Sequence, residues 1–279
     1  MALEKVSKIL EVADKANAAV IGFNCIDYNM IRSCMLAAEE TGKPIICMLY
    51  PVHDYEFNSI SLSTFAVQVK ELAKSVCAPI GLHLDHCSDL AYIELAVRSG
   101  FTSIMYDGSM LPYEENVYNT RKAVEMCKAY DVDVEAELGY VGVGSAYDPA
   151  NVELYTKPEL AADFVQKTKV DSLAVAIGNA HGVYKAEPRL DFERLDAINA
   201  ATDIPLVLHG GSGIPDDQLE CAFSRGISKF NVGTELWQVW KNALAKYAGD
   251  ASVHPNEMSV KIQDTLKEYL RVKLELTKL

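Results

Sequence analysis

The stretch PIGLHLDHCSDLAYIELAVRSG, residues 79–100, contains the repeating unit that decides the fold. Its first half is an apolar run that ends in polar residues. Its second half, LAYIELAVRSG, spaces apolar residues as an amphipathic helix does. Similar apolar runs recur with onsets about 30 residues apart on average, which is the length of one βα unit. The eight runs begin at Ala18, Pro44, Pro79, Ser103, Asp133, Ser172, Pro205 and Lys229.

The alternation of apolar runs with helical patterns predicts a parallel sheet covered by helices. Eight repeats without a break in composition predict closure into a (β/α)8 TIM barrel, of the α/β class. We expect a single domain over residues 1–279, with residues 260–279 forming a C-terminal helical extension. A doubly wound open sheet is the alternative, but it would need a glycine-rich loop after the first strand, where this chain has NCIDYNM.

The composition is that of a folded, acidic protein. Hydrophobic residues make up 49% of the chain, and 39 acidic against 26 basic residues give a formal charge of −13. Such a charge repels phosphate backbones and anionic lipids, so we expect neither nucleic acid nor a membrane as partner. No apolar run approaches the roughly 18 residues of a membrane span, and the first residues do not form an export signal. We therefore expect a cytoplasmic protein.

Seven cysteines are scattered along the chain without CxxC pairs. Most of them lie inside apolar runs, which is typical of free buried thiols. We interpret them as core residues.

Three histidines fall where predicted strands end: His86, His181 and His209. In a barrel of this kind, the carboxyl ends of all strands meet at one mouth, where catalytic groups lie. A single histidine there is more often a hydrogen-bonded structural residue, but three together favour a metal site. Three imidazoles with one open position form a typical catalytic zinc site, which indicates metal-assisted carbonyl chemistry.

Three carboxylates lie near the same strand ends. Asp85 precedes His86 on one strand, so its side chain is expected to point away from that ligand, although it could still reach the mouth. It either orients an imidazole or acts as a general acid or base. Glu137 and Asp107 are either site residues or partners for cations inside the barrel.

A predicted anion site lies beside the histidines. The sequence GGSG, residues 210–213, offers backbone N–H groups at a predicted helix start, the arrangement that binds phosphate. A plain tight turn is the alternative interpretation. Ser212, Gly182, Lys185, Asn231 and Thr234 lie at neighbouring strand ends. A metal beside a phosphate indicates a phosphorylated carbonyl substrate.

The motifs HLDHC, VEAELG, SLAVAIGNAHGVYK, PLVLHGGSGIP and NVGTE together resemble the class II, metal-dependent ketose-bisphosphate aldolases, which include fructose- and tagatose-bisphosphate aldolases. The similarity runs from about Ala18 to Trp237. It implies a barrel that forms a homodimer or homotetramer and binds one Zn²⁺ through His86, His181 and His209. Co²⁺ or another divalent metal could take the same ligands, and a monovalent cation could accompany it.

The resemblance also assigns roles to other residues. Asp85 is implied as the proton donor in cleavage, at the hydroxyl that becomes the aldehyde. Glu137 and Asp107 match carboxylates near an alternate metal position. The residues implied around the sugar phosphate are Asn24, Gly182, Lys185, Gly210, Gly211, Ser212, Asn231, Val232, Gly233 and Thr234.

One loop departs from the family pattern. The family carries a proton-moving Glu after the strand that ends in ELG, but this chain has YVGVGSAYDPANVE, with Ser145 and Ala146 at the expected place. Asp148 and Glu153 are the candidate replacements, and both are otherwise surface residues. Three functions therefore stay open: a lyase, an epimerase or isomerase that uses the same enediolate, and a non-catalytic sugar-phosphate binder.

The distal end of the substrate site also departs from the family pattern. Fructose-bisphosphate members carry two arginines for the second phosphate, where this chain has Trp237 and, in HPNE, Asn256. This predicts a ketose 1-phosphate rather than a 1,6-bisphosphate, unless Lys241 or Arg271 from a partner subunit replaces the charge. The segment 48–61 contains His53, Asp54 and Glu56, which match no family pattern and stay unassigned.

Overall fold

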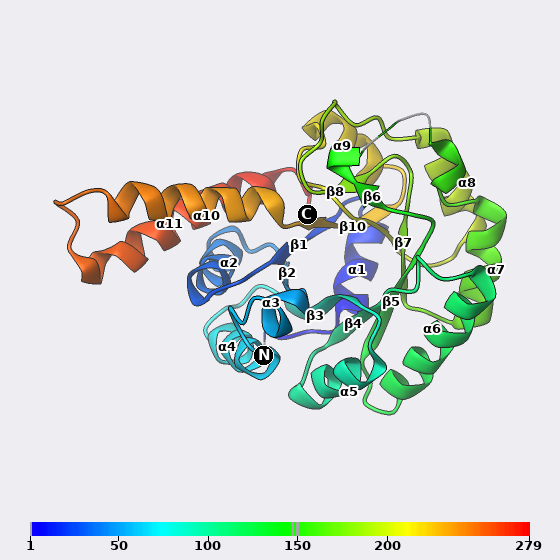
Figure 1. Ribbon diagram of the computed structural model, residues 1–279, viewed down its shortest axis with the longest axis horizontal. Helices are drawn as coiled ribbons and strands as arrows, with labels where there is room; N and C mark the ends of the chain where they lie inside the picture. Colours follow the sequence, from blue (N-terminus) through cyan, green and yellow to red (C-terminus); the bar gives the residue numbers. More distant parts are fainter. Residues whose placement is uncertain (1, 147, 149–150) are drawn as a thin grey trace.

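The structure is a computed structural model that describes residues 2–146, 148 and 151–279. Eight parallel strands close into a barrel in the order β1-β10-β9-β7-β5-β4-β3-β2, with helices around it (Figure 1). This confirms the predicted (β/α)8 architecture. The barrel strands are β1 Val20–Asn24, β2 Ile45–Leu49, β3 Ile80–Cys87, β4 Ser103–Tyr106, β5 Asp133–Leu138, β7 Ser172–Val175, β9 Leu206–Leu208 and β10 Ile227–Val232.

Helices cover the outside of the barrel and connect its strands. The connecting helices are α2 Tyr28–Thr41, α3 Val52–Tyr55, α4 Leu62–Ala73, α5 Leu90–Ser99, α6 Tyr113–Lys128, α7 Pro158–Thr168, α8 Phe192–Ala201 and α9 Asp216–Phe223. Two further short strands, β6 (Gly142–Val143) and β8 (Ala180–His181), pair outside the barrel. Among the described residues, none of the helices combines the length and apolar character that a membrane span requires.

The unit at residues 79–100 shows why the sequence folds in this way. In β3 the apolar residues are buried, because a barrel strand faces the core on both sides. The side chain of Asp89 then accepts hydrogen bonds from the backbone N–H groups of Ala91 and Tyr92 and so caps α5. The helix ends at Gly100, whose φ of 91° is a left-handed conformation that favours glycine.

One end of the barrel is closed by α1 (Val6–Lys15). Its buried face contributes Val6, Ile9 and Leu10, which cluster with Val20 and Met48 of the barrel. The opposite end, at the carboxyl ends of the strands, is therefore the one available for a site.

Helices α10 (Thr234–Ala248) and α11 (Pro255–Glu275) project from the barrel as an arm (Figure 1). The arm is anchored because α11 packs along α2 and α10 and buries Leu266, Leu270 and Leu274. Val260 and Val272 on the same helix stay exposed.

Candidate active site

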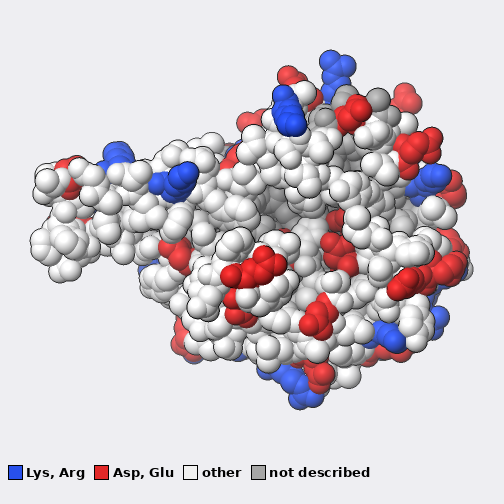
Figure 2. All heavy atoms as spheres, viewed as in Figure 1, with Lys and Arg blue, Asp and Glu red and all other residues white. Residues whose placement is uncertain are grey.

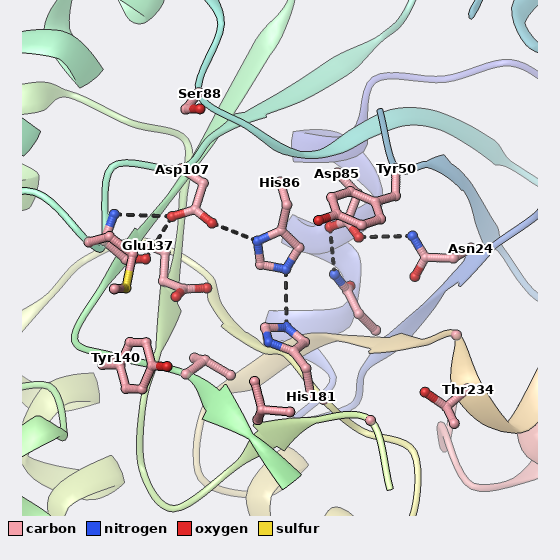
Figure 3. Close-up of a pocket in the computed structure, with 18 of the residues that line it drawn as sticks. Asn24, Tyr50, Asp85, His86, Ser88, Asp107, Glu137, Tyr140, His181 and Thr234 are labelled. Carbon is pink, nitrogen blue, oxygen red and sulfur yellow. Dashed lines mark hydrogen bonds and ion pairs between the residues drawn. The ribbon is translucent and has the colours of Figure 1, made fainter. Parts of the chain in front are cut away.

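A cavity of about 740 Å³ opens at the carboxyl ends of the barrel strands. Its walls come from residues at the ends of β1, β3, β4, β5 and β10 and from the start of α10. Figure 3 shows how the polar side chains of these elements converge there. The site predicted from separate strand ends is thus brought together in one place.

The three predicted histidines meet at this cavity. His86 Nε2 lies 3.1 Å from His181 Nε2 and 2.9 Å from His209 Nδ1. Ligand nitrogens around a tetrahedral zinc ion, each about 2.0–2.1 Å from it, are separated by about 3.3 Å. The three nitrogens are therefore arranged as metal ligands, and an imidazole triad is a donor set that zinc and similar divalent ions accept.

The outer nitrogens of two rings are fixed by carboxylates. His86 Nδ1 donates to Asp107 Oδ2 across 2.8 Å, and His209 Nε2 donates to Glu135 Oε1 across 2.9 Å. These hydrogen bonds leave His86 Nε2 and His209 Nδ1 free to bind a metal, and they set the orientation of each ring.

The groups around the triad favour a positive charge on His209. Burial disfavours the charged form of His209, but Glu135 and Glu137 raise its pKa to about 10. Burial and the neighbouring His86 and His209 lower the pKa of His181 to about 3. The surrounding carboxylates therefore favour a cation here.

Glu135 belongs to a buried network that the sequence analysis did not identify. Lys229 Nζ donates to Glu135 Oε2 across 2.7 Å, and both side chains are fully buried inside the barrel. His83 Nε2 lies 3.5 Å from the same ammonium group and its Nδ1 lies 2.9 Å from Ser103 Oγ. The available signal was a charged residue inside an apolar run, as in KFNVG and DVEAEL.

Asp85 and His86 both line the cavity, although they are neighbours on one strand. A regular strand would direct their side chains to opposite faces. Here the register between β3 and β4 shifts between Leu84 and Cys87, and His86 has a φ of 46°. This bulge turns both side chains toward the mouth, so the expectation that Asp85 points away from the ligand is corrected.

Asp85 is held between two amides. Asn24 Nδ2 donates to its Oδ2 across 2.8 Å, and Asn231 Nδ2 donates to its Oδ1 across 3.1 Å. Burial alone would raise the pKa of Asp85, but the charges of His86, His209 and Lys229 lower it to about 2. The carboxylate is therefore ionised and fixed in orientation.

Asp107 and Glu137 form a second ligand group with His86. Burial opposes ionisation of Asp107, but the hydrogen bonds from His86 and Ser109 lower its pKa. Glu137 Oε2 is buried and lies 3.2 Å from His209 Nδ1, with which it forms an ion pair when that ring is protonated. A buried carboxylate at this distance from the triad fits the alternate metal position that the resemblance implies.

The predicted phosphate residues surround one side of the cavity. Those that line it are Asn24, Gly182, Gly210, Ser212, Asn231, Gly233 and Thr234. At Gly210, with a φ of 64°, an added Cβ would lie 2.1 Å from the carbonyl oxygen of Ala180, so only glycine fits. Gly211 and Val232 lie behind this surface, whereas Lys185 lines a neighbouring cavity of about 460 Å³ that shares Gly182, Ser212 and Thr234.

The two loop carboxylates lie away from this cavity. Asp148 and Glu153 are both exposed, and neither lines it. Glu153 lies in a short 3-10 helix, Val152–Leu154. Their proposed catalytic role therefore needs a change in the loop.

Part of the cavity wall is aromatic and apolar. It includes Tyr50, Tyr55, Met110, Leu111 and Trp237, and the part of the chain that the structure describes contributes no Lys or Arg to the cavity lining. Figure 2 shows Asp and Glu around the centre of this face and Lys and Arg toward its periphery. Trp237 Nε1 donates to the carbonyl oxygen of Asn24 across 2.8 Å.

The unassigned residues of segment 48–61 have different positions. His53 is buried, with its ring edge-on to Trp237 at a centroid distance of 5.2 Å, and burial lowers its pKa. Asp54, in α3, accepts hydrogen bonds from the side chain of Tyr92 in α5 and from the backbone of Leu62 in α4. It therefore connects these three helices. Glu56 is exposed.

Comparisons with known proteins agree with this geometry. Residues 4–278 match the family model described as fructose-bisphosphate aldolase class II. The chain is 40% identical over 239 residues to the D-tagatose-1,6-bisphosphate aldolase subunit GatY of Klebsiella oxytoca, which covers 84% of this chain and 82% of that protein.

Solved structures agree as well. The YdjI aldolase of Escherichia coli K12 matches with a TM-score of 0.88 and 33% identity, over 99% of this chain and 97% of that one. The fructose-bisphosphate aldolase of Campylobacter jejuni shares the fold, with a TM-score of 0.82 and 23% identity over 99% and 95% of the two chains.

A TIM barrel whose mouth carries three convergent imidazoles, a buried carboxylate and a glycine cradle defines a metal-dependent aldolase. The chain belongs to the class II fructose-bisphosphate aldolase family. It is a carbon–carbon lyase of carbohydrate metabolism, and the resemblance drawn from the motifs is confirmed.

Proposed function

We propose that this aldolase uses Zn²⁺ held by His86, His181 and His209, and that its substrate is a ketose 1-phosphate. The products are dihydroxyacetone phosphate and an aldehyde that carries no phosphate. The observation that carries this proposal is the lining of the cavity. Glycines line it at the predicted phosphate site, and no Lys or Arg from the described residues lines any part of it to bind a second phosphate.

The bound metal ion would supply Lewis acidity that polarises the C2 carbonyl of the ketose. Asp85 then handles the proton at the C4 hydroxyl. For the C3–C4 bond to break, this hydroxyl must lose its proton, so Asp85 is the acceptor in cleavage and the donor in condensation. The direction implied by the resemblance is corrected by this proton balance. The hydrogen bonds from Asn24 and Asn231 keep the carboxylate in place for both directions.

The proximal phosphate is assigned to the glycine side. Gly182, Gly210 and Ser212 line the cavity there, and α10 begins beside them at Thr234. Backbone N–H groups and a helix N-terminus favour a phosphate dianion without a cationic side chain. Lys185, in the adjoining cavity, adds positive charge near this side.

Among the residues that the structure describes, none forms a comparable site for a second phosphate at the distal end. Recognition of a phosphate dianion usually uses arginine, whose fork makes two charge-assisted hydrogen bonds. Trp237 and Tyr50 instead present ring surfaces, which suit an apolar or hydroxylated chain. The alternative source of positive charge is Lys241, or Arg271 contributed by a partner subunit.

The test is a comparison of kcat/KM for fructose 1,6-bisphosphate, tagatose 1,6-bisphosphate and the corresponding 1-phosphates, with aldehyde release as the readout. We expect the 1-phosphates to be preferred. A hundredfold preference for a bisphosphate, equivalent to about 2.7 kcal/mol of transition-state binding, would overturn the assignment. Interconversion of ketose phosphates without aldehyde release would identify an epimerase instead.

We also infer that the protein works in the cytoplasm as a homodimer or homotetramer. All seven cysteines are free, as is usual in a reducing compartment. The projecting α10–α11 arm exposes Val260 and Val272, which suits contact with a second copy. Light scattering on the purified protein tests the subunit number.

A further inference from the structure

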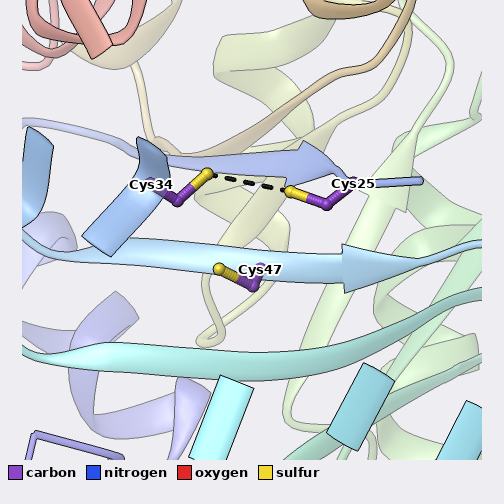
Figure 4. A group of neighbouring side chains, drawn as sticks. All are labelled: Cys25, Cys34 and Cys47. Atoms are coloured by element: carbon purple, nitrogen blue, oxygen red, sulfur yellow. Dashed lines mark hydrogen bonds between the residues drawn. The ribbon is translucent and has the colours of Figure 1, made fainter. Parts of the chain in front are cut away.

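Three buried thiols form a cluster that the aldolase site does not use. Cys25 follows β1 directly, Cys34 lies in α2 and Cys47 lies in β2 (Figure 4). All three residues have an exposed fraction of 0%. Cys25 Sγ lies 3.7 Å from Cys34 Sγ, and the three sulfur atoms all lie within 4.8 Å of one another.

The spacing of the sulfur atoms fits a three-coordinate metal ion. At a metal–sulfur distance of about 2.3 Å, three sulfurs in a plane around an ion are separated by about 4.0 Å. The observed contact of 3.7 Å lies close to this value, and the 4.8 Å limit on all pairs requires only small side-chain movements.

The donor set selects the kind of ion. Among the described residues, the group consists of thiols without a carboxylate or imidazole, which excludes hard cations such as Mg²⁺ and Ca²⁺. Zinc in proteins usually takes a fourth ligand, and these buried thiols have no solvent access that would supply water. A soft ion that accepts three sulfur ligands, Cu(I), is the best match.

We propose that Cys25, Cys34 and Cys47 form a binding site for Cu(I), separate from the catalytic metal site. On binding, copper–sulfur bonds form at the Sγ atoms of Cys25, Cys34 and Cys47, and each thiol that becomes a thiolate ligand releases its proton to solvent. Copper enters and remains as Cu(I), so no electrons are transferred. The ion joins β1, α2 and β2 next to Asn24, the residue that donates to Asp85. Because the thiols are buried, copper enters while α2 is displaced or during folding.

The experiment uses the zinc-loaded protein, refolded anaerobically with two equivalents of Cu(I) and then treated with a competing Cu(I) chelator. We expect one copper per chain to be retained, with X-ray absorption showing three sulfur neighbours. Absence of retained copper, or nitrogen neighbours around it, would overturn the proposal. So would loss of two thiols through a Cys25–Cys34 disulfide with copper released.

Matched variants locate the ion. Cys47→Ser and Cys34→Ser should each lower the retained copper at least tenfold. Cys127→Ser, at an equally buried cysteine outside the cluster, and Cys77→Ser, at an exposed one, should retain it. Zinc content and thermal unfolding confirm that each variant is folded. Equal copper retention in the cluster variants and the controls would contradict the assignment of the ion to the three thiols. If one variant fails to fold, the X-ray absorption spectrum of the wild-type protein still tests this assignment.

Discussion

Asn24 Nδ2, at the end of β1, donates a hydrogen bond to Asp85 Oδ2, near the end of β3, across 2.8 Å. Strand β2 lies between these two strands, so the bond passes over the mouth of the barrel. It connects the wall that carries the thiol cluster to the carboxylate that we propose as the proton acceptor in cleavage.

Asp85→Ala should lose nearly all turnover while keeping its metal. General acid–base groups typically contribute about 10²–10⁴-fold to a rate, and Asp85 is not one of the three imidazole ligands. Steady-state kinetics together with zinc analysis checks this. Asn24→Ala, which removes one of the two amide hydrogen bonds, should lower kcat by a smaller factor. A variant at Asp85 with near-normal kcat would exclude the proton-transfer role.

Removal of the metal should abolish cleavage. A chelator that strips the triad removes the Lewis acid, and zinc or cobalt added back should restore the rate, because both ions accept imidazole ligands. Activity is measured alongside metal content in each state. Full activity in metal-free protein would contradict the mechanism.

The buried pair of Lys229 and Glu135 should be strongly coupled. Lys229→Met removes the ammonium partner of Glu135 Oε2 and leaves only the hydrogen bond from His209 to Oε1, so it should lower the free energy of unfolding by about 3–5 kcal/mol. The double variant Lys229→Met with Glu135→Gln should recover much of this loss. Chemical denaturation measures both. As a control, Lys74→Ala, which breaks an exposed pair with Glu71, should change the free energy of unfolding by less than about 1 kcal/mol.

Asp148→Ala and Glu153→Ala test the loop that lacks the family's glutamate. Replacing the residue that supplies the base should slow proton exchange on dihydroxyacetone phosphate at least tenfold. Binding of that ligand should be unchanged. The other variant should exchange at the normal rate. Hydrogen–deuterium exchange followed by NMR distinguishes them, and normal exchange in both variants would place the base elsewhere.

Trp237→Arg tests the distal side. A guanidinium group at this position of the cavity wall should raise kcat/KM for a 1,6-bisphosphate relative to its 1-phosphate by about tenfold, the value of one added charge-assisted contact. Trp237→Phe keeps an aromatic wall and should leave the ratio unchanged. An unchanged ratio in Trp237→Arg would indicate that the second phosphate, if bound, contacts another surface.

The strand runs and the three histidines were predictable from the sequence because both signals are local. An apolar run followed by an amphipathic pattern specifies one βα unit, and eight such units specify a barrel whose strand ends meet. His86, His181 and His209 were therefore expected at one mouth, although the final positions of His86 and His181 also depend on the bulge in β3 and on the pairing of β8 with β6.

Other features depend on contacts between residues distant in sequence. The bulge that turns Asp85 and His86 toward one cavity arises from the pairing of β3 with β4, which alternation along one strand does not reveal. Lys229 and Glu135 are 94 residues apart, and only closure of the barrel brings their charges together.

The cysteines show most clearly which features follow from local sequence and which depend on tertiary packing. Their apolar surroundings in the sequence indicated burial, which Cys25, Cys34, Cys47, Cys87 and Cys127 confirm, but the interpretation of all seven as core residues is wrong for the exposed Cys77 and the half-buried Cys221. The meeting of Cys25, Cys34 and Cys47 at one point depends on how α2 packs against β1 and β2. By itself, the sequence determined the barrel, the three candidate histidine ligands and the family, because each follows from local pattern or motif. Only the tertiary structure decided which charges are paired, which described residues line the cavity and which thiols converge, because these depend on side-chain packing across strands.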